Sequence, residues 1–322
     1  MKEALKIIFL GTPEFAVDSL EILTQQEHNV VAVITAPDQR AGRGQVVQSS
    51  PVKKFALATG IKVLQPEKLK SPDFIHELQD LQADLFIVVA FRMLPEIVWQ
   101  MPKMGTFNLH ASLLPQYRGA APINHVIING ETKTGLTTFF LKQEIDTGKI
   151  IFQEKIDIHP NETAGDLHDR MKIIGASLVL KTVEAISSGD FKTIEQGKLI
   201  PSNLPLKTAP KIFREDCRID WNLKSAEIFN KIRGLSPYPA AFTTFLSPSG
   251  ESFSVKVYKT EMTNTRNNLP PSVIVTDGKS ELGVTTVDGF LLIRDIQLSG
   301  KKAMKTEEFL RGFRINTDWK VG

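Results

Sequence analysis

The feature that most constrains the fold is a series of short, almost wholly apolar segments separated by amphipathic ones. The apolar segments LKIIFL, NVVAVIT, IKVL and LFIVVA predict strands at 5–10, 29–35, 61–64 and 85–90. Apolar residues at helical spacing between them predict helices, including one near 70–82. Near-continuous apolar strands need cover on both faces, so the pattern predicts an α/β domain with a doubly wound, mostly parallel sheet.

The character of the sequence changes near residue 200. Three prolines within ten positions predict an extended linker at 201–211. Beyond it, turn signals separate short strands, and the Asp-Gly pairs at 277–278 and 288–289 favour hairpins. We therefore predict an α/β domain at 1–200, the linker, and a small antiparallel barrel or sandwich at 212–322.

Composition excludes several classes of protein. Apolar residues make up 42% of the chain and charged residues 23%, as in ordinary globular domains. The single cysteine, Cys217, excludes an intrachain disulfide and fits a cytoplasmic protein. The longest apolar run, at 85–91, is far shorter than a membrane span, so we expect no membrane association. The net charge of +3 has its excess in 201–322, which indicates a polyanion partner or merely a solvated surface.

Motifs for common cofactors are missing from the sequence. The turn GTPEFA at 11–16 carries one glycine where a dinucleotide fingerprint has three, and no G-x-x-x-x-G-K-S/T segment occurs. The six histidines form no close pair and no H-x-x-x-H motif. We therefore predict neither a nucleotide cofactor nor a metal.

The stretch NLHASLLPQYRGAAP, residues 108–122, carries the strongest chemical signal. Alternation on an extended segment sends Asn108, His110 and Ser112 to one side, as a catalytic wall or as the solvated face of an edge strand. Asp146, in EIDTGK, lies at the end of another predicted strand, and in a parallel sheet the strand ends and the loops beyond them share one edge that forms the ligand crevice. Asp146 can therefore stand beside His110 if the two segments are neighbours. An imidazole, a carboxylate that orients it and an amide that stabilises an oxyanion together favour acyl transfer.

These segments resemble the folate-dependent formyltransferases. The resemblance rests on IIFLGTPEFAV, APDQRAGRGQVVQSSPVKKFA, NLHASLLPQYRGAAP and IDTGKI, and it runs over essentially the whole chain. It implies a Rossmann-like catalytic domain followed by an OB-like β-barrel that binds tRNA. It also implies that Asn108, His110 and Asp146 are the catalytic residues.

The resemblance further implies that 10-formyltetrahydrofolate is the formyl donor. The family's folate site includes the bend formed by Ser112, Leu113, Leu114 and Pro115. After the strand at 85–90 the family usually has Ala-Tyr-Gly, whereas this chain has phenylalanine and arginine in the last two places. Backbone groups would make the contacts there, so the pterin-binding candidates remain Phe91, Arg92, Met93 and Leu94.

The acceptor implied by the resemblance is the α-amine of initiator methionyl-tRNA. We expect the chain to act as a monomer. Loop 36–52, with Arg40 and Arg43, could order on RNA or could be a mobile surface loop. Lys207 and Lys211 could contact phosphates or could be merely solvated.

Other interpretations of the sequence stay open. Arg118 either holds an anion or braces its turn. The rival functions are formyl transfer to a small amine such as an amino-sugar nucleotide, hydrolysis of formyltetrahydrofolate, and a catalytically silent RNA- or folate-binding module.

Overall fold

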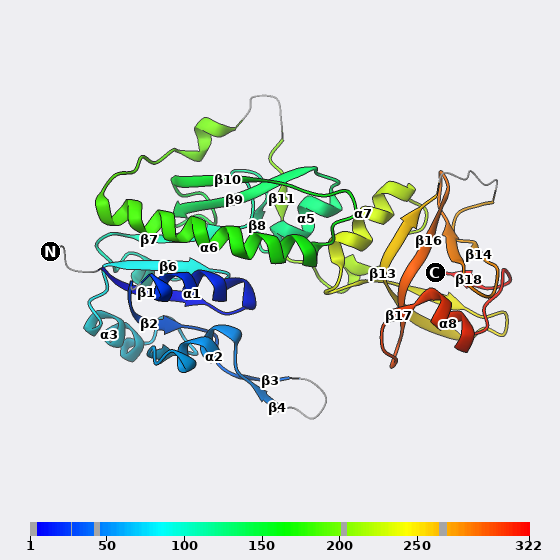
Figure 1. Cartoon of the computed structure of the whole chain (residues 1–322), viewed down its shortest axis with the longest axis horizontal. Helices are drawn as coiled ribbons and strands as arrows, with labels where there is room; N and C mark the ends of the chain where they lie inside the picture. The colour runs from blue at the N-terminus through cyan, green and yellow to red at the C-terminus, as the bar shows by residue number, and fades with distance from the viewer. Residues whose placement is uncertain (1–4, 27, 42–45, 201–204, 264–268) are drawn as a thin grey trace. The chain divides into compact units, whose positions relative to one another are not determined.

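The computed structural model describes residues 5–26, 28–41, 46–200, 205–263 and 269–322 (Figure 1). The chain forms two compact units that interleave along the sequence. The first unit runs over 1–119, 134–156 and 168–208, and the second over 120–133, 157–167 and 209–322. Two short stretches that precede residue 200 therefore belong to the second unit. Part of the predicted linker, residues 201–204, lies outside the described residues.

The first unit is built on a seven-stranded sheet with the order β10-β9-β7-β6-β1-β2-β5. Its strands are β1 (Lys6–Gly11), β2 (Asn29–Ile34), β5 (Val63–Leu64), β6 (Leu85–Val89), β7 (Thr106–His110), β9 (Lys133–Phe140) and β10 (Ile150–Asp157). Strands β5, β2, β1, β6 and β7 run parallel, whereas β9 is antiparallel to β7. The predicted mostly parallel, Rossmann-like sheet is confirmed.

Helices cover both faces of this sheet. Helix α3 (Pro72–Asp80) buries Phe74 and Leu78 in a cluster that includes Val88 of β6. On the opposite face lies α6 (Ala164–Ser188), the long green helix of Figure 1. Its backbone approaches β7 closely, since a Cβ atom at Gly175 would lie 2.9 Å from Leu109. The remaining helical segments of this unit are η1 (Glu14–Ala16), α1 (Val17–Gln25), α2 (Pro51–Ala58), α4 (Glu96–Trp99) and η2 (Gln196–Leu199).

The predicted loop 36–52 contains a short two-stranded ribbon. Strands β3 (Gln39–Ala41) and β4 (Val46–Gln48) pair antiparallel, with Arg40 opposite Val47. The segment joining them, residues 42–45, lies outside the described residues. The loop therefore projects as a ribbon with its two ends beside α2 (Figure 1).

The second unit is an antiparallel sheet in the order β14-β15-β16-β13-β12-β18, with β17 paired to β16. The strands are β12 (Ala241–Leu246), β13 (Ser252–Met262), β14 (Ile274–Thr276), β15 (Leu282–Thr285), β16 (Phe290–Leu298), β17 (Met304–Lys305) and β18 (Lys320–Val321). A bridge between Val273 and Lys320 links the two edges of the sheet. The sheet therefore nearly closes, and of the barrel and sandwich alternatives the barrel is confirmed.

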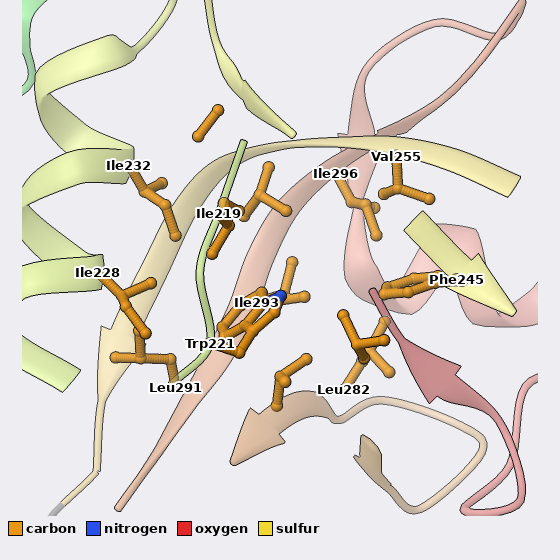
Figure 2. Packing of buried hydrophobic residues seen from close by; sticks show 14 of the residues in the cluster. Ile219, Trp221, Ile228, Ile232, Phe245, Val255, Leu282, Leu291, Ile293 and Ile296 are labelled. Atoms are coloured by element: carbon orange, nitrogen blue, oxygen red, sulfur yellow. The ribbon is translucent and has the colours of Figure 1, made fainter. Parts of the chain in front are cut away.

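Apolar side chains fill the barrel from its strands and from α7 (Ser225–Leu235), as Figure 2 shows. Ile228 and Ile232, one helical turn apart on α7, are buried in this core. Trp221 is buried beside them and donates its indole N–H to Thr243 Oγ1 at 3.0 Å. This hydrogen bond satisfies the polar end of a side chain whose ring is apolar.

Helix α5 (Pro122–Ile128) packs against α7 within the second unit, and Asn124 donates to the carbonyl of Gly234 at 2.8 Å. The other short elements are β8 (Arg118–Gly119), β11 (Thr208–Ala209), η3 (Glu215–Cys217) and α8 (Thr306–Gly312). Among the described residues, the helices lack either the length or the apolar character required to span a membrane.

Candidate active site

Asn108 and His110 lie on a strand in the interior of the sheet, since β7 is flanked by β6 and β9. This placement excludes the edge-strand alternative. Asn108 pairs with Val88, whose side chain packs on the α3 side of the sheet. Asn108 and His110 therefore both point to that side, away from Leu109 and α6. Asn108 is partly exposed, whereas His110 is buried with 6% of its surface exposed.

Each ring nitrogen of His110 faces a different polar group. Nε2 lies 2.9 Å from the carbonyl oxygen of Tyr117, and Nδ1 lies 3.9 Å from Asp146 Oδ2. A carbonyl can only accept a hydrogen bond, so the contact with Tyr117 places a proton on Nε2. Nδ1 is therefore the nitrogen that can exchange a proton on the side of Asp146.

Asp146 reaches His110 by way of a loop. Because β9 is antiparallel to β7, with Phe140 beside Phe107, the two strands do not end at the same edge of the sheet. The residues after β9 instead bring the carboxylate back, and Oδ2 accepts the backbone N–H of Gly119 at 2.9 Å. The premise of a shared strand edge was wrong, although the expected proximity of Asp146 and His110 is present.

Two residues beside the imidazole have a strained, left-handed backbone. Tyr117 and Asp146 both adopt positive φ, at 58° and 53°. Such conformations cost about 1–3 kcal/mol for a non-glycine residue and persist where surrounding contacts fix them. The two strained residues are those that face the two nitrogens of His110.

The Ser112–Pro115 bend is rigid and directs its side chains inward. Ser112 is fully buried and donates its hydroxyl to the carbonyl of Gln116 at 2.7 Å. Thr137 Oγ1 donates to the Ser112 carbonyl at 2.6 Å and accepts the Leu114 N–H at 3.2 Å. Leu114 is 2% exposed, Pro115 is buried, and Leu113 is partly buried. Folate contacts by these four residues stay a prediction, with backbone groups the more available donors and acceptors.

The second predicted folate segment begins beside β7, because Val89 pairs with Leu109. The left-handed residue of this segment is Ala90, with φ of 48°, and Arg92 does not adopt positive φ. Arginine is therefore compatible with the backbone where the family usually has glycine. Its guanidinium donates to the carbonyls of Pro66 and Glu67. Within the segment, Phe91 is partly buried, Met93 is 70% exposed and Leu94 is buried.

A polar network fixes the base of loop 36–52. Lys53 Nζ lies 2.6 Å from Asp38 Oδ2 and 2.6 Å from Gln65 Oε1. Gln65 in turn donates to Asp38 Oδ1 at 2.9 Å and to the carbonyl of Ala36 at 2.8 Å. The hydrogen bond from Lys53 holds the pKa of Asp38 below its ordinary value. The loop is therefore anchored at its base.

The predicted RNA-contacting residues are spread over several segments. Arg40 lies on β3, and Arg43 lies outside the described residues. Lys207, in the first unit, is exposed, and its carbonyl accepts the Tyr117 N–H at 2.7 Å. Lys211, in the second unit, is also exposed and has Nζ 5.4 Å from the ring centre of Phe213.

The sequence analysis did not identify Gln196, a buried side chain near the site. Arg118 donates to Gln196 Oε1 from Nε at 3.1 Å and from Nη2 at 2.6 Å. These two bonds favour a bracing role for Arg118 over anion binding. Gln196 lies in the polar segment EQGK, which matches no motif that could have identified it. The contributions of Tyr117 and Gly119 were also missed, because they come from backbone groups. Within the described part of the chain, no group of three His, Cys, Asp or Glu side chains could hold a metal ion.

Comparison with known families places the chain. Residues 5–183 match the family described as Formyl transferase, and residues 211–314 match Formyl transferase, C-terminal domain. The chain belongs to the formyl transferase family. It is 52% identical over 320 residues to a methionyl-tRNA formyltransferase of Bacteroides thetaiotaomicron, covering 99% of each chain. It is 48% identical over 319 residues to the protein of the same name from Flavobacterium johnsoniae, again covering 99% of each.

Two solved structures share this fold. A sugar 3N-formyl transferase, WlaRD, studied with dTDP and 5-N-formyl-THF, matches with a TM-score of 0.64 and 24% identity, covering 93% of this chain and 100% of its own. HypX from Aquifex aeolicus, in complex with tetrahydrofolic acid, matches with a TM-score of 0.62 and 19% identity, covering 96% of this chain and 47% of its own.

Proposed function

We propose that this chain transfers the formyl group of 10-formyltetrahydrofolate to the α-amine of methionyl-tRNA, so that the product can initiate translation. The observation that carries the chemistry is the placement of His110 Nδ1 3.9 Å from Asp146 Oδ2, with Asn108 on the same face of β7. The choice of acceptor is supported by relatives of that name, such as the one 52% identical over nearly the whole chain.

The reaction requires that the formyl carbon is held in a fixed position and that a proton is removed from the amine. The neutral amine attacks the formyl carbon, and negative charge develops on the formyl oxygen, which the Asn108 amide and a His110 ring protonated at Nδ1 as well as at Nε2 would stabilise. Asp146 would orient the imidazole and receive the amine proton, directly or through water. As the bond from the formyl carbon to N10 breaks, N10 gains a proton, which returns the site to its starting charge. An acid–base group contributes about 10²–10⁴ to such a rate and an oxyanion donor about 10²–10³.

The folate would lie along the ends of β6 and β7. The segments expected to hold it are the Ser112–Pro115 bend and residues 91–94, mainly through backbone groups, and the second begins beside β7 in the strand register. Held there, the folate supplies the formyl carbon next to His110. The hydrogen bonds within the bend support this placement, since a fixed wall would keep the reacting carbon in position.

The tRNA would be held by parts of the chain outside this pocket. Loop 36–52 is anchored at its base by Lys53 and carries Arg40 and Arg43, so it can present positive charge to an acceptor end. We retain 1–200 as the catalytic domain, 201–211 as the linker and 212–322 as the tRNA-binding domain. The protein is expected to act in the cytoplasm as a monomer.

One assay separates this function from its rivals. Formyl transfer is measured with charged initiator tRNA, with an amino-sugar nucleotide and with water as the acceptor. We expect turnover on the tRNA alone, and His110→Ala or Asp146→Ala should lower kcat at least about a hundredfold with little change in folate affinity. Near-normal turnover in either variant would remove that residue from the chemistry, and turnover on the sugar alone would replace the proposed acceptor.

The acceptor itself is tested by Arg43→Ala, with Lys70→Ala as a control at an exposed lysine that has no expected role. If Arg43 contacts a phosphate in the single-stranded acceptor end of the tRNA, Arg43→Ala should weaken the use of charged tRNA. The slope of the logarithm of tRNA affinity against the logarithm of salt concentration should then become shallower by about 0.7. If it contacts a base, discrimination between initiator and elongator tRNA should relax instead. Unchanged activity, slope and discrimination would leave the loop with no part in recognition.

A further inference from the structure

Gln196 satisfies every hydrogen-bonding position of its side-chain amide. It is 2% exposed and lies beyond the end of α6. Its oxygen accepts both bonds from Arg118, and its nitrogen donates to the carbonyl of Asp146 at 2.8 Å and to that of Gly148 at 2.9 Å. A glutamine amide offers two donors and two acceptor sites, so all four are used.

These bonds join the two backbone segments that face His110. On one side, Arg118 follows Tyr117, whose carbonyl contacts His110 Nε2, and precedes the Gly119 N–H that binds Asp146 Oδ2. On the other side, Gln196 holds the carbonyl of Asp146, whose carboxylate faces Nδ1. One amide therefore links both neighbours of the imidazole, each of which has a strained left-handed backbone.

Gln196 is itself fixed to the sheet. Ile194, two residues earlier, exchanges two backbone hydrogen bonds of 2.9 Å with Ile150, the first residue of β10. The glutamine thus projects from an anchored segment and can transmit that rigidity to the loop carrying Asp146. From this geometry we propose that Gln196 is a positioning residue that holds Asp146 against His110 during formyl transfer; the inference rests on the proposed roles of those two residues.

Two variants of the full chain test this role. Gln196→Glu keeps the shape and the acceptor for Arg118 but replaces the two donors with oxygen, which would then face two carbonyls. Gln196→Leu removes all four bonds. Lys198→Ala, at an exposed position on the same turn, is the matched control.

The measurements are kcat and KM for formyl transfer to methionyl-tRNA, the pH profile of kcat, and thermal unfolding. Both Gln196 variants should lower kcat about tenfold to a hundredfold, with KM for the folate changed less than about threefold, because the reacting groups are displaced while the folate contacts remain. The limbs of the pH profile should shift, since the contact of Asp146 with His110 is loosened. Lys198→Ala should match wild type in every readout.

A structural role alone would give a different result. Variants that unfold earlier but keep wild-type kcat, KM and pH profile while folded would overturn the proposal. If neither Gln196 variant folds, Arg118→Lys loosens the same contacts from the opposite side and is judged by the same readouts. Asp146→Asn is measured in parallel. Full activity in that variant would refute the proposed chemistry, whereas an inactive Asp146→Asn with unaffected Gln196 variants would refute the positioning role alone.

Discussion

Replacing Gly148 with alanine should disable the site through a single methyl group. A Cβ atom at this position would lie 1.6 Å from the carbonyl oxygen of Phe140 and 2.8 Å from its carbonyl carbon. Gly148 does not adopt positive φ, so the substitution acts through this steric contact and not through backbone preference. The obstruction is backbone at the end of β9, which cannot rotate away as a side chain could.

The size of the effect follows from the movement required. To bring the Cβ to 3.0 Å from the oxygen, the two segments must separate by about 1.4 Å. Asp146 lies two residues before Gly148 and shares with it the hydrogen bonds from Gln196, so the carboxylate should move with the loop. A misplacement of about 1 Å near reacting groups can cost about a hundredfold in rate, or about 2.7 kcal/mol of transition-state stabilisation.

The assay is kcat/KM for formyl transfer to methionyl-tRNA at 25 °C, with the folded fraction checked by circular dichroism. Gly148→Ala should lose about a hundredfold in kcat/KM and about 1–3 kcal/mol in unfolding free energy from the forced contact. Gly197→Ala is the control, because no atom lies within 4 Å of a Cβ added there. A folded Gly148→Ala protein with wild-type kcat/KM would refute the claim that this loop must hold Asp146 in place.

Three further outcomes are expected. Asp38→Asn should destabilise the protein near neutral pH and lose this effect below about pH 4, because the depressed pKa of Asp38 gives stability only while the carboxylate is ionised; urea unfolding across pH measures it. A fragment ending at residue 200 should melt below the full chain, since α5 loses its partner α7, and an equal melting temperature would contradict this. Trp221→Phe should cost about 1–3 kcal/mol in urea unfolding, because Thr243 Oγ1 loses its indole donor and keeps only the 3.4 Å hydrogen bond that it donates to the carbonyl of Gly322; an unchanged midpoint would show that the indole hydrogen bond contributes little.

Local pattern was sufficient for most of the secondary structure. The apolar segment predicted at 85–90 is β6, and the helix predicted near 70–82 is α3. Turn signals in the second half fall between strands, as with Asp288-Gly289 between β15 and β16. Such features depend on neighbouring residues alone, because a buried strand must be apolar on both faces and a tight turn needs particular residues.

The site could be predicted only in part, because most of its contacts join residues that are far apart in the sequence. Alternation along β7 was enough to place Asn108 and His110 on one face. Their contact with Asp146 was expected from a shared strand edge, but it depends on the loop after β9 and on the backbone of Gly119. Gln196 could not be found at all, since its role comes from contacts with residues 48–78 positions away and from no local motif.

The amino-acid sequence alone thus indicated the helices and strands, the change from α/β to antiparallel β, and the residues able to take part in catalysis. The tertiary structure decided how distant segments meet: two units that interleave along the chain, a barrel nearly closed by the bridge from Val273 to Lys320, and an imidazole held between Tyr117 and Asp146. Periodicity and turn chemistry are local, whereas sheet closure and side-chain networks depend on which segments can bury apolar surface and satisfy polar groups together.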